Sequence, residues 1–383
     1  MKILQIIALI GLMTPSICSG QNEVIDSLEQ ILPTAKPGWD RGDVLLGLAR
    51  LYINTDQKKS GRAHLLEIHK ISKEFDIPEL KAYALIIQNV YTYLHENNAD
   101  KAIEECNEAI EIAKRTNCQD ALIYASYQLA ENYLYEKGDW EMAEQILLKA
   151  VDGLTDEVGD KSQGAVLRNL GYIYGNKGEY EKAMSYYRKA VSILIENVNN
   201  PRIDPRIGRI SALNMQPQAH VTYTLNAMGD LEIKRGNFDE ALKFKKQALE
   251  QVQSINFDVD IAWMNNEIAQ LYNEMGDYVS ALSFLQKSRA YFESQEIKRD
   301  LAECNSVMIS LLSKLEDYAE AEKVVNNNIA YYLETKDSII LVRTYMQAVD
   351  IQIGLNRYEE ALALADKAEH LACLLYTSPS PRD

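Results

Sequence analysis

Apolar residues recur along most of the chain at spacings of three and four, and short polar turns interrupt them. Leu167, Leu170 and Tyr174 precede one such turn, and Tyr187 and Ala190 follow it. Spacings of three and four place side chains on one face of an α-helix. Similar apolar segments flank the turns near residues 236 and 276. The pattern therefore predicts consecutive hairpins, each made of two amphipathic helices.

A small residue, which we call the anchor residue, follows each turn at a nearly constant interval. The intervals are 41, 41, 40, 58, 40, 40 and 40 residues, so the period is 40 apart from one insertion. A fixed period in the range of 20–50 residues is typical of repeat arrays, in which each unit buries its apolar face against its neighbours. The anchor residues are Gly61, Ala102, Ala143, Ala183, Ala241, Ala281, Ala321 and Ala361.

The turns share the pattern Gly-x-aromatic-x-x-Ala, which runs from Gly178 to Ala183 in the clearest hairpin. Related turns begin at Gly236, Gly276 and Asn356. Glycine ends a helix well because it adopts the left-handed conformation without a clash at Cβ. We expect the aromatic side chain to fill the corner between the two helices and the anchor residue to be small because the backbones approach closely there. Glu316 replaces the glycine in one turn.

Three places depart from the pattern. The turn before Gly61 does not fit, so the first hairpin is degenerate. The hairpin anchored at Ala143 has one extra residue between Ala130 and Gly138, which predicts that its first helix bulges or shifts its register. The long interval contains an insertion at residues 197–217 with three prolines.

The insertion is locally basic in an otherwise acidic chain. Its arginines are Arg202, Arg206 and Arg209. Three guanidinium groups could hold a carboxylate or a phosphate group. A surface loop between two hairpins explains the segment as well, because long insertions add little to the free energy of loop closure.

The run Leu-x-x-Leu-Gly-x-x-Tyr from Leu167, the turn from Gly178, and the following Tyr187 and Ala190 resemble the tetratricopeptide repeat family. The resemblance covers about residues 41–370 and implies an all-α solenoid, a superhelix of seven to eight antiparallel hairpins. The usual unit of this family has 34 residues, and a 40-residue unit is similar to the longer variants of bacterial regulators and transport adaptors. HEAT and armadillo arrays have similar periods, but they lack the Gly-x-aromatic-x-x-Ala corner.

The resemblance implies a protein or peptide partner in a groove walled by the first helix of each hairpin. The repeat register places eight residues outward on that face: Arg168, Asn169, Tyr172, Asn226, Asp230, Asn266, Gln270 and Asn273. Asn and Gln suit the backbone of an extended peptide because an amide both donates and accepts hydrogen bonds. Ordinary solvated polar residues explain these positions equally well.

The net charge of −16 and the pI of 4.9 argue against nucleic acid as a partner, because phosphate binding requires a positive surface. Solubility alone explains the acidity, and a basic partner is the more specific alternative.

The sequence predicts no catalytic site, no metal site and no cofactor. Between the predicted signal peptide and residue 373 the chain has three cysteines, Cys106, Cys118 and Cys304, and no Cys-x-x-Cys pair. This pattern favours buried thiols over a disulfide framework or a zinc site, although a Cys106–Cys118 bridge stays open. The five histidines form no His-Glu-x-x-His motif. The rival hypothesis is an enzyme whose site has no familiar motif.

Residues 1–20 have the features of a secretory signal peptide. Lys2 precedes an apolar run at residues 3–13 that is too short to span a bilayer, and small residues follow Pro15. Cleavage before Gln21 would export the chain to the periplasm or another extracytoplasmic side of the membrane. Lipidation of Cys18 is disfavoured because Ile17 and Pro15 stand where lipoprotein sites carry a small residue and a leucine.

Residues 373–383 resemble the in-frame translation of a sequencing-library adapter. On that interpretation residues 21–372 are the natural repeat array, which lacks the polar cap that terminal repeats need. We therefore expect the natural protein to continue, as the exported N-terminal part of a membrane-anchored signalling regulator with a cytoplasmic kinase or DNA-binding domain. The alternative is a stand-alone periplasmic scaffold. Translation of the gene beyond residue 372 would distinguish the two hypotheses.

Overall fold

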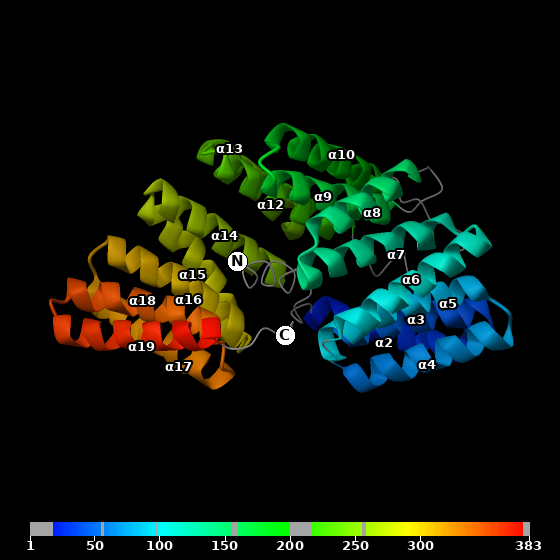
Figure 1. The fold of residues 1–383 in the computed structure, drawn as a ribbon, viewed down its shortest axis with the longest axis horizontal. Coiled ribbons are helices and arrows are strands. Elements are labelled where there is room, and N and C mark those ends of the chain that lie inside the picture. Colours follow the sequence, from blue (N-terminus) through cyan, green and yellow to red (C-terminus); the bar gives the residue numbers. More distant parts are fainter. Residues whose placement is uncertain are drawn as a thin grey trace. The chain divides into compact units, whose positions relative to one another are not determined.

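The computed structural model describes residues 18–54, 57–96, 98–154, 160–199, 217–254 and 258–377. Throughout these residues the chain is helical, and they contain no β-strand (Figure 1). The chain divides into unit 1, residues 1–255, and unit 2, residues 256–383. In each unit, consecutive helices pack as antiparallel hairpins, so the predicted all-α solenoid is confirmed.

Unit 1 contains five hairpins in its described residues and one N-terminal helix. The elements are α2 (Cys18–Ile31), α3 (Trp39–Asn54), α4 (Lys58–Glu74), α5 (Pro78–Tyr91), α6 (Ala99–Thr116), α7 (Gln119–Asn132), α8 (Trp140–Asp152), α9 (Asp160–Asn176), α10 (Tyr180–Asn199), α12 (Pro217–Lys234) and α13 (Phe238–Gln253). A 3₁₀ helix, η1 (Leu32–Thr34), follows α2, and two π-helical turns, η2 (Thr92–Glu96) and η3 (Tyr133–Lys137), extend α5 and α7. The first helices α3, α5, α7, α9 and α12 also contact one another in succession.

Unit 2 contains three hairpins in its described residues. They are formed by α14 (Asp258–Met275), α15 (Tyr278–Ser294), α16 (Lys298–Lys314), α17 (Tyr318–Thr335), α18 (Ser338–Gly354) and α19 (Tyr358–Thr377). Its core contains mainly aliphatic side chains from α14 to α18, and the partly buried Leu364 of α19 packs against them.

The hairpin turns have the backbone conformation that the glycine pattern predicts. Gly178, Gly236 and Gly276 have φ angles of +82°, +79° and +82°. Glu316 and Asn356, which replace the glycine in two turns, both have a φ of +60°. A left-handed residue with a Cβ costs about 1–2 kcal/mol, so the tertiary packing imposes this turn even where the local sequence disfavours it.

All eight anchor residues are buried, as predicted. At Gly61, an added Cβ would lie 2.8 Å from Cγ1 of Ile53 and 3.2 Å from the carbonyl oxygen of Ala49. The first anchor is therefore glycine because a Cβ there would be too close to Ile53.

A second close approach lies four residues after the anchor residues Ala183 and Ala241. There the second helix faces the position twelve residues before the anchor residue. The Tyr187 ring occupies the space beside Gly171, since a Cβ there would lie 2.6 Å from the ring. Lys245 lies beside Gly229 in the same way, with 2.9 Å from an added Cβ to Lys245 Cγ. In the α14–α15 hairpin the matching positions hold Ala269 and Leu285, both fully buried. In these three hairpins a larger side chain on the second helix thus accompanies a smaller one on the first, whereas the α16–α17 hairpin has the buried Ile309 and Val325 at the matching positions.

The π-helical turns explain the two intervals of 41 residues. The bulge predicted in the hairpin of Ala143 is confirmed as η3. The turn η2 was not predicted, although the interval between Gly61 and Ala102 is also 41 residues and carried the same signal. A π turn accommodates one extra residue in an α-helix without changing its ends, which preserves the packing of the flanking hairpins.

Some predictions from the sequence fall outside the described residues. Residues 1–17, most of the insertion including its three arginines, and residues 378–383 belong to this group. The last helix, α19, extends to Thr377 and so includes the first residues of the segment that resembles an adapter. In the part of the chain that the structure describes, no helix combines the length and the apolar character needed to cross a bilayer.

The close approach at the anchor residues predicts a cost for a larger side chain. Ala281→Leu should reduce the free energy of unfolding by roughly 1–3 kcal/mol, because a fully buried position is overfilled. Urea unfolding followed by circular dichroism measures this. Ser283→Leu, at an exposed position of the same helix, is the matched control and should change stability by less than about 0.5 kcal/mol. Equal effects of the two substitutions would contradict the packing argument.

Candidate functional site

The first helices α7, α9 and α12 carry buried polar and charged side chains in a layer where apolar residues are usual. We define the polar cluster as Glu131, Arg168, Asn169, Asn226, Asp230 and Lys245. All of these except the half-buried Asp230 are buried. Fully buried charged residues are rare unless they are paired, so this cluster is the first candidate for a functional site.

Lys245 is the least expected member, because it occupies a core position of the repeat. The same position in other hairpins holds Leu147, Tyr187, Leu285 and Val325. The side chain of Lys245 is 1% exposed, and its ammonium donates hydrogen bonds to Asn226 Oδ1 at 2.8 Å and Asp230 Oδ1 at 2.6 Å. A buried ammonium is costly unless it is paired and hydrogen-bonded. The absence of a Cβ at Gly229 gives the lysine stem the room to reach these partners.

Two amides of the cluster have their orientations fixed by charged neighbours. An ammonium only donates, so the Asn226 oxygen faces Lys245 and the Asn226 amino group points away from it. The Asn169 amino group donates to Glu131 Oε1 at 3.3 Å, which leaves the Asn169 oxygen as its other polar atom. Among the described residues, neither of these remaining atoms has a hydrogen-bond partner. The two side chains therefore present one donor and one acceptor from neighbouring helices.

The environment of Glu131 is poor in water. Burial raises the pKa of this carboxyl group, while the nearby Arg168 and hydrogen bonds from Asn169 and Tyr127 oppose the rise. Burial, and then the nearby Glu131, also raise the phenol pKa values of Tyr127 and Tyr135. The negative charge of Glu131 is thus partly compensated by Arg168, and the carboxyl group is largely shielded from solvent.

Glu131 also lines a small pocket between the two π turns. The pocket is formed by Asn89, Val90, Tyr93, Gln128, Glu131, Asn132 and Tyr135. Its cavity volume is about 10 Å³, which is room for about one water molecule. Tyr93 comes from η2 and Tyr135 from η3, so each extra residue of the repeat places a tyrosine in the same wall.

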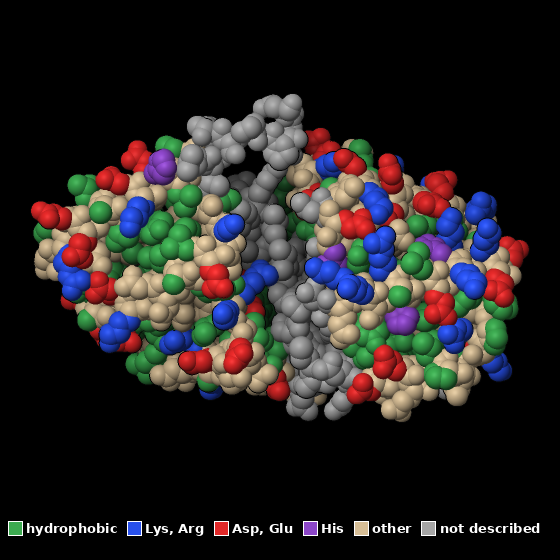
Figure 2. Space-filling model, turned by 90° about the horizontal axis from the view of Figure 1, so that it is seen from below, with side chains coloured by type: hydrophobic (Ala, Val, Ile, Leu, Met, Phe, Trp, Pro, Cys, Tyr) green, Lys and Arg blue, Asp and Glu red, His purple; other side chains and the backbone are tan. Residues whose placement is uncertain are grey.

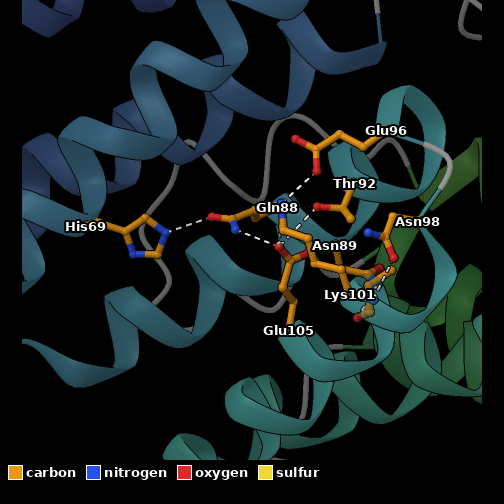
Figure 3. Close-up of polar contacts among 9 residues, drawn as sticks. His69, Gln88, Asn89, Thr92, Glu96, Asn98, Lys101 and Glu105 are labelled. Atoms are coloured by element: carbon orange, nitrogen blue, oxygen red, sulfur yellow. Dashed lines mark hydrogen bonds and ion pairs between the residues drawn. The ribbon is translucent and has the colours of Figure 1, made fainter.

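A polar network holds η2 in place beside the pocket (Figure 3). Gln88 Oε1 accepts a hydrogen bond from His69 Nε2 at 3.0 Å, and Gln88 Nε2 donates to Glu105 Oε1 at 2.6 Å. Thr92 donates to the same carboxylate oxygen at 3.1 Å. The Asn89 amide donates to the carbonyl oxygen of Ala102 at 2.9 Å, which ties the helix before η2 to the anchor residue of its hairpin. The π turn is therefore fixed by specific side-chain contacts.

The structure corrects the predicted orientation of several candidate residues. Five of the eight residues expected to face outward are buried: Arg168, Asn169, Asn226, Asn266 and Asn273. They lie where neighbouring helices pack, and hydrogen bonds such as that from Asn273 Nδ2 to Ser310 Oγ (3.1 Å) replace contacts with water. Tyr172 and Asp230 are half-buried, and Gln270 is exposed.

The structure places the unit 1 candidates in two groups on neighbouring helices and adds one residue to each group. Arg168 and Asn169 lie beside Glu131, and Asn226 and Asp230 bind Lys245. Asn266, Gln270 and Asn273 belong to α14 of unit 2. The sequence analysis missed Glu131 and Lys245. Lys245 could have been found from the repeat alignment, because it occupies a position that is apolar in the other repeats.

Cysteines and surface charges add no further site. Cys106 and Cys304 are buried, Cys118 is half-buried, and none of the three forms a disulfide with a described residue. In the described residues, no group of three or more His, Cys, Asp or Glu side chains is arranged to hold a metal ion. On the face drawn in Figure 2, acidic and basic side chains are intermixed.

Unit 2 contains one carboxyl group with a strongly shifted pKa. Burial, and then the nearby Asp300, raise the pKa of Glu303 to about 7, and Arg299 and Arg343 oppose the shift. Glu303 and Asp300 lie on the first turns of α16, and burial raises the pKa of Asp300 as well.

Comparisons with known proteins agree with the repeat pattern. The family model of the tetratricopeptide repeat matches residues 120–196 and 221–294, which confirms the resemblance over these stretches. No protein of curated function matches the sequence.

Solved structures of the same fold cover nearly the whole chain. The apo form of the quorum sensor NprR from B. thuringiensis is 14% identical, with a TM-score of 0.60 over 92% of this chain and 98% of that one. The signal transduction ATPase PH0952 from Pyrococcus horikoshii, which has a tetratricopeptide repeat sensor, is 15% identical with a TM-score of 0.59, over 91% of this chain and 52% of that one. The apo form of RapI is 15% identical, with a TM-score of 0.53 over 85% and 96% of the two chains. At these identities the similarity shows the fold.

The shifted pKa of Glu303 predicts a pH dependence of stability. Because the folded state raises this pKa, the protonated carboxyl group stabilises the fold fully below about pH 4.5, and this contribution is lost as the pH rises to about 7. The free energy of unfolding of Glu303→Gln, relative to that of the wild type, should therefore be roughly 2–3 kcal/mol higher at pH 8 than at pH 4.5. Urea unfolding at both pH values measures the difference. Glu293→Gln, at an exposed position of α15, is the control. A pH-independent difference for Glu303→Gln would show that burial does not shift this group.

Proposed function

We propose that this tetratricopeptide-repeat chain is a non-catalytic scaffold that binds an extended segment of a partner protein against the polar cluster of unit 1. The observation that carries the proposal is the opposite orientation of two amides on neighbouring helices. Asn226 presents its amino group and Asn169 presents its oxygen. A peptide group also carries one acceptor and one donor, so this pair complements the backbone of an extended chain.

The energetics of the cluster support the same proposal. The remaining Asn226 amino group and Asn169 oxygen have no hydrogen-bond partner among the described residues, and a bound peptide would supply partners to both. Lys245 and Glu131 hold the two amides before binding, so little rotational freedom is lost when a peptide arrives. Gly229 permits this arrangement because a larger residue would displace the lysine stem.

Two proteins of similar structure are described as sensors, which supports a sensing role for this chain. NprR is described as a quorum sensor, and the repeats of PH0952 are described as a sensor. We propose that this chain likewise reports the presence of its bound partner. The features of residues 1–20 support a further proposal, that binding occurs outside the cytoplasm. An extracytoplasmic part of a membrane-anchored regulator and a stand-alone periplasmic scaffold are both consistent with this role.

The orientation of the amides predicts which substitutions weaken binding. A library of synthetic ten-residue peptides is screened on the full chain, and the dissociation constant of the best peptide is measured by fluorescence anisotropy. Asn226→Ala and Asn169→Ala should each weaken binding about 5–10-fold, the equivalent of one hydrogen bond. Asn326→Ala, at an exposed position of α17, is the control and should leave the affinity unchanged.

Two further measurements separate this site from the alternatives. Methylation of single backbone nitrogens in the peptide should weaken binding at one position, and Asn169→Ala should remove that effect. If the Asn variants bind as the wild type does, and changing Arg202, Arg206 and Arg209 to Ala abolishes binding, the insertion is the binding site and the proposal is wrong.

A further inference from the structure

The helix α18 of unit 2 has one open face that is apolar. It packs against α16, α17 and α19 on its other faces (Figure 1). On the open face, Ile339, Met346 and Ile353 recur every seven residues and are 46%, 52% and 48% exposed, and the half-buried Val342 and Val349 lie between them. Spacings of three and four place all five side chains, which we call the apolar stripe, along one face of the helix. Single exposed apolar residues are normal, whereas a continuous set of them indicates an interaction site.

The residues of the stripe differ from those at the same positions of the preceding first helices. In α16 these positions hold Arg299, Ala302, Ser306, Ile309 and Ser313, and in α14 they hold Val259, Ala262, Asn266, Ala269 and Asn273. Both helices contact the next first helix of the array, so small and polar residues are the ones that suit stacking within the array. The five aliphatic residues of α18 therefore indicate a partner helix of a different kind.

The spacing of the stripe is that of a coiled-coil seam. Residues 339, 346 and 353 correspond to a positions and residues 342 and 349 to d positions of two heptads. The seam is also symmetric about Met346, because Ile339 and Ile353 each lie seven residues from it. If two copies of α18 pack in antiparallel orientation with the two-fold axis at Met346, Ile339 of each copy faces the partner's Ile353. A two-fold interface requires such a self-complementary surface.

Two charged residues beside the stripe have the same symmetry. Arg343 lies three residues before Met346 and Asp350 four residues after it, and both are exposed. Neither forms an ion pair with another described residue, although Arg343 lies near enough to Glu303 to oppose the rise of its pKa that burial causes. In the antiparallel arrangement, Arg343 of each copy lies beside the partner's Asp350. The charges as well as the apolar residues are therefore complementary to those of a second copy.

From this symmetry we infer that the chain forms an antiparallel two-fold dimer through the apolar stripe of α18. Removal of the stripe from water drives the association, and the two Arg343–Asp350 pairs determine its orientation. The inference goes beyond the proposed peptide-binding function and does not depend on it, because the residues of the polar cluster belong to unit 1.

Sedimentation equilibrium of the full chain over a range of concentrations tests whether the dimer exists. The average mass should rise with concentration towards twice the 43.5 kDa of one chain. Met346→Asp places two like charges at the two-fold axis and should raise the dissociation constant about tenfold or more. Val279→Asp, at a position of α15 that is 83% exposed, adds the same charge outside the stripe and should leave the constant unchanged.

Exchange of the two charges tests the orientation of the helices. Arg343→Glu and Asp350→Lys should each weaken the dimer about threefold or more, because each places like charges together twice. The double variant restores both pairs with the opposite sign, and its dissociation constant should lie within about twofold of the wild-type value. Circular dichroism shows whether each variant is folded, and if a charge variant is not, the cysteine variants below decide the orientation.

Single cysteines locate the two-fold axis. In a chain that carries Cys18→Ser and Cys373→Ser, mild oxidation should link Met346→Cys into a disulfide dimer. Ile339→Cys and Ile353→Cys should link only when the two variants are mixed, since about 21 Å of helix separates these positions, and a disulfide requires Cα atoms about 4.4–6.8 Å apart. Val279→Cys is the control for random collision and should stay monomeric.

Three results would overturn the inference. The first is a monomeric mass at every concentration, which would mean that no second copy covers the stripe. The second is a dimer that Met346→Asp weakens no more than Val279→Asp does, which would place the interface elsewhere. The third is efficient linkage of Ile339→Cys with itself, which would exclude the antiparallel arrangement.

Discussion

In the middle of the array the packing depends on a close approach of the two helices of a hairpin, four residues after the anchor residues Ala183 and Ala241. At this point one side chain of the second helix meets the residue twelve positions before the anchor on the first helix. Tyr187 and Lys245 face glycines, whereas Leu285 corresponds to Ala269. Across these three hairpins the summed volume of the two facing residues therefore varies less than the volume of either residue alone. Because cores are packed to crystal-like density, this matching allows hairpins of different sequence to stack in one array.

The same constraint makes room for function. In the hairpin anchored at Ala241 the facing pair is Gly229 and Lys245. The long side chain of Lys245 places its ammonium group next to Asn226 and Asp230 on the first helix. An apolar residue at this position would give the fold at least similar stability, because a buried ion pair often stabilises a protein no more than well-packed apolar residues do. A local departure from the pattern of the other repeats is typical of functional sites, and here it orients one amide of the proposed peptide site.

Much of the architecture could be predicted from the sequence. The anchor period, the glycine turns and the apolar spacings depend on local backbone geometry, and the structure confirms all three. The orientation of the polar candidates could not be predicted in the same way. Whether Asn169 faces solvent or Glu131 depends on the crossing of α7 and α9, which the period does not determine. The residue count signals the π turns, but their convergence on one pocket becomes visible only when neighbouring hairpins are placed side by side.

The most direct test of the matched close approach is a double-mutant cycle at Gly229 and Lys245. Gly229→Ala places a Cβ 2.9 Å from the lysine stem and should destabilise the fold, whereas Lys245→Leu leaves unfilled space beside Gly229. The double variant has the Ala–Leu pair of the α14–α15 hairpin, so the two changes should compensate each other. Urea unfolding of the four proteins should give a favourable coupling of at least about 1 kcal/mol. Additivity within about 0.3 kcal/mol would contradict the account.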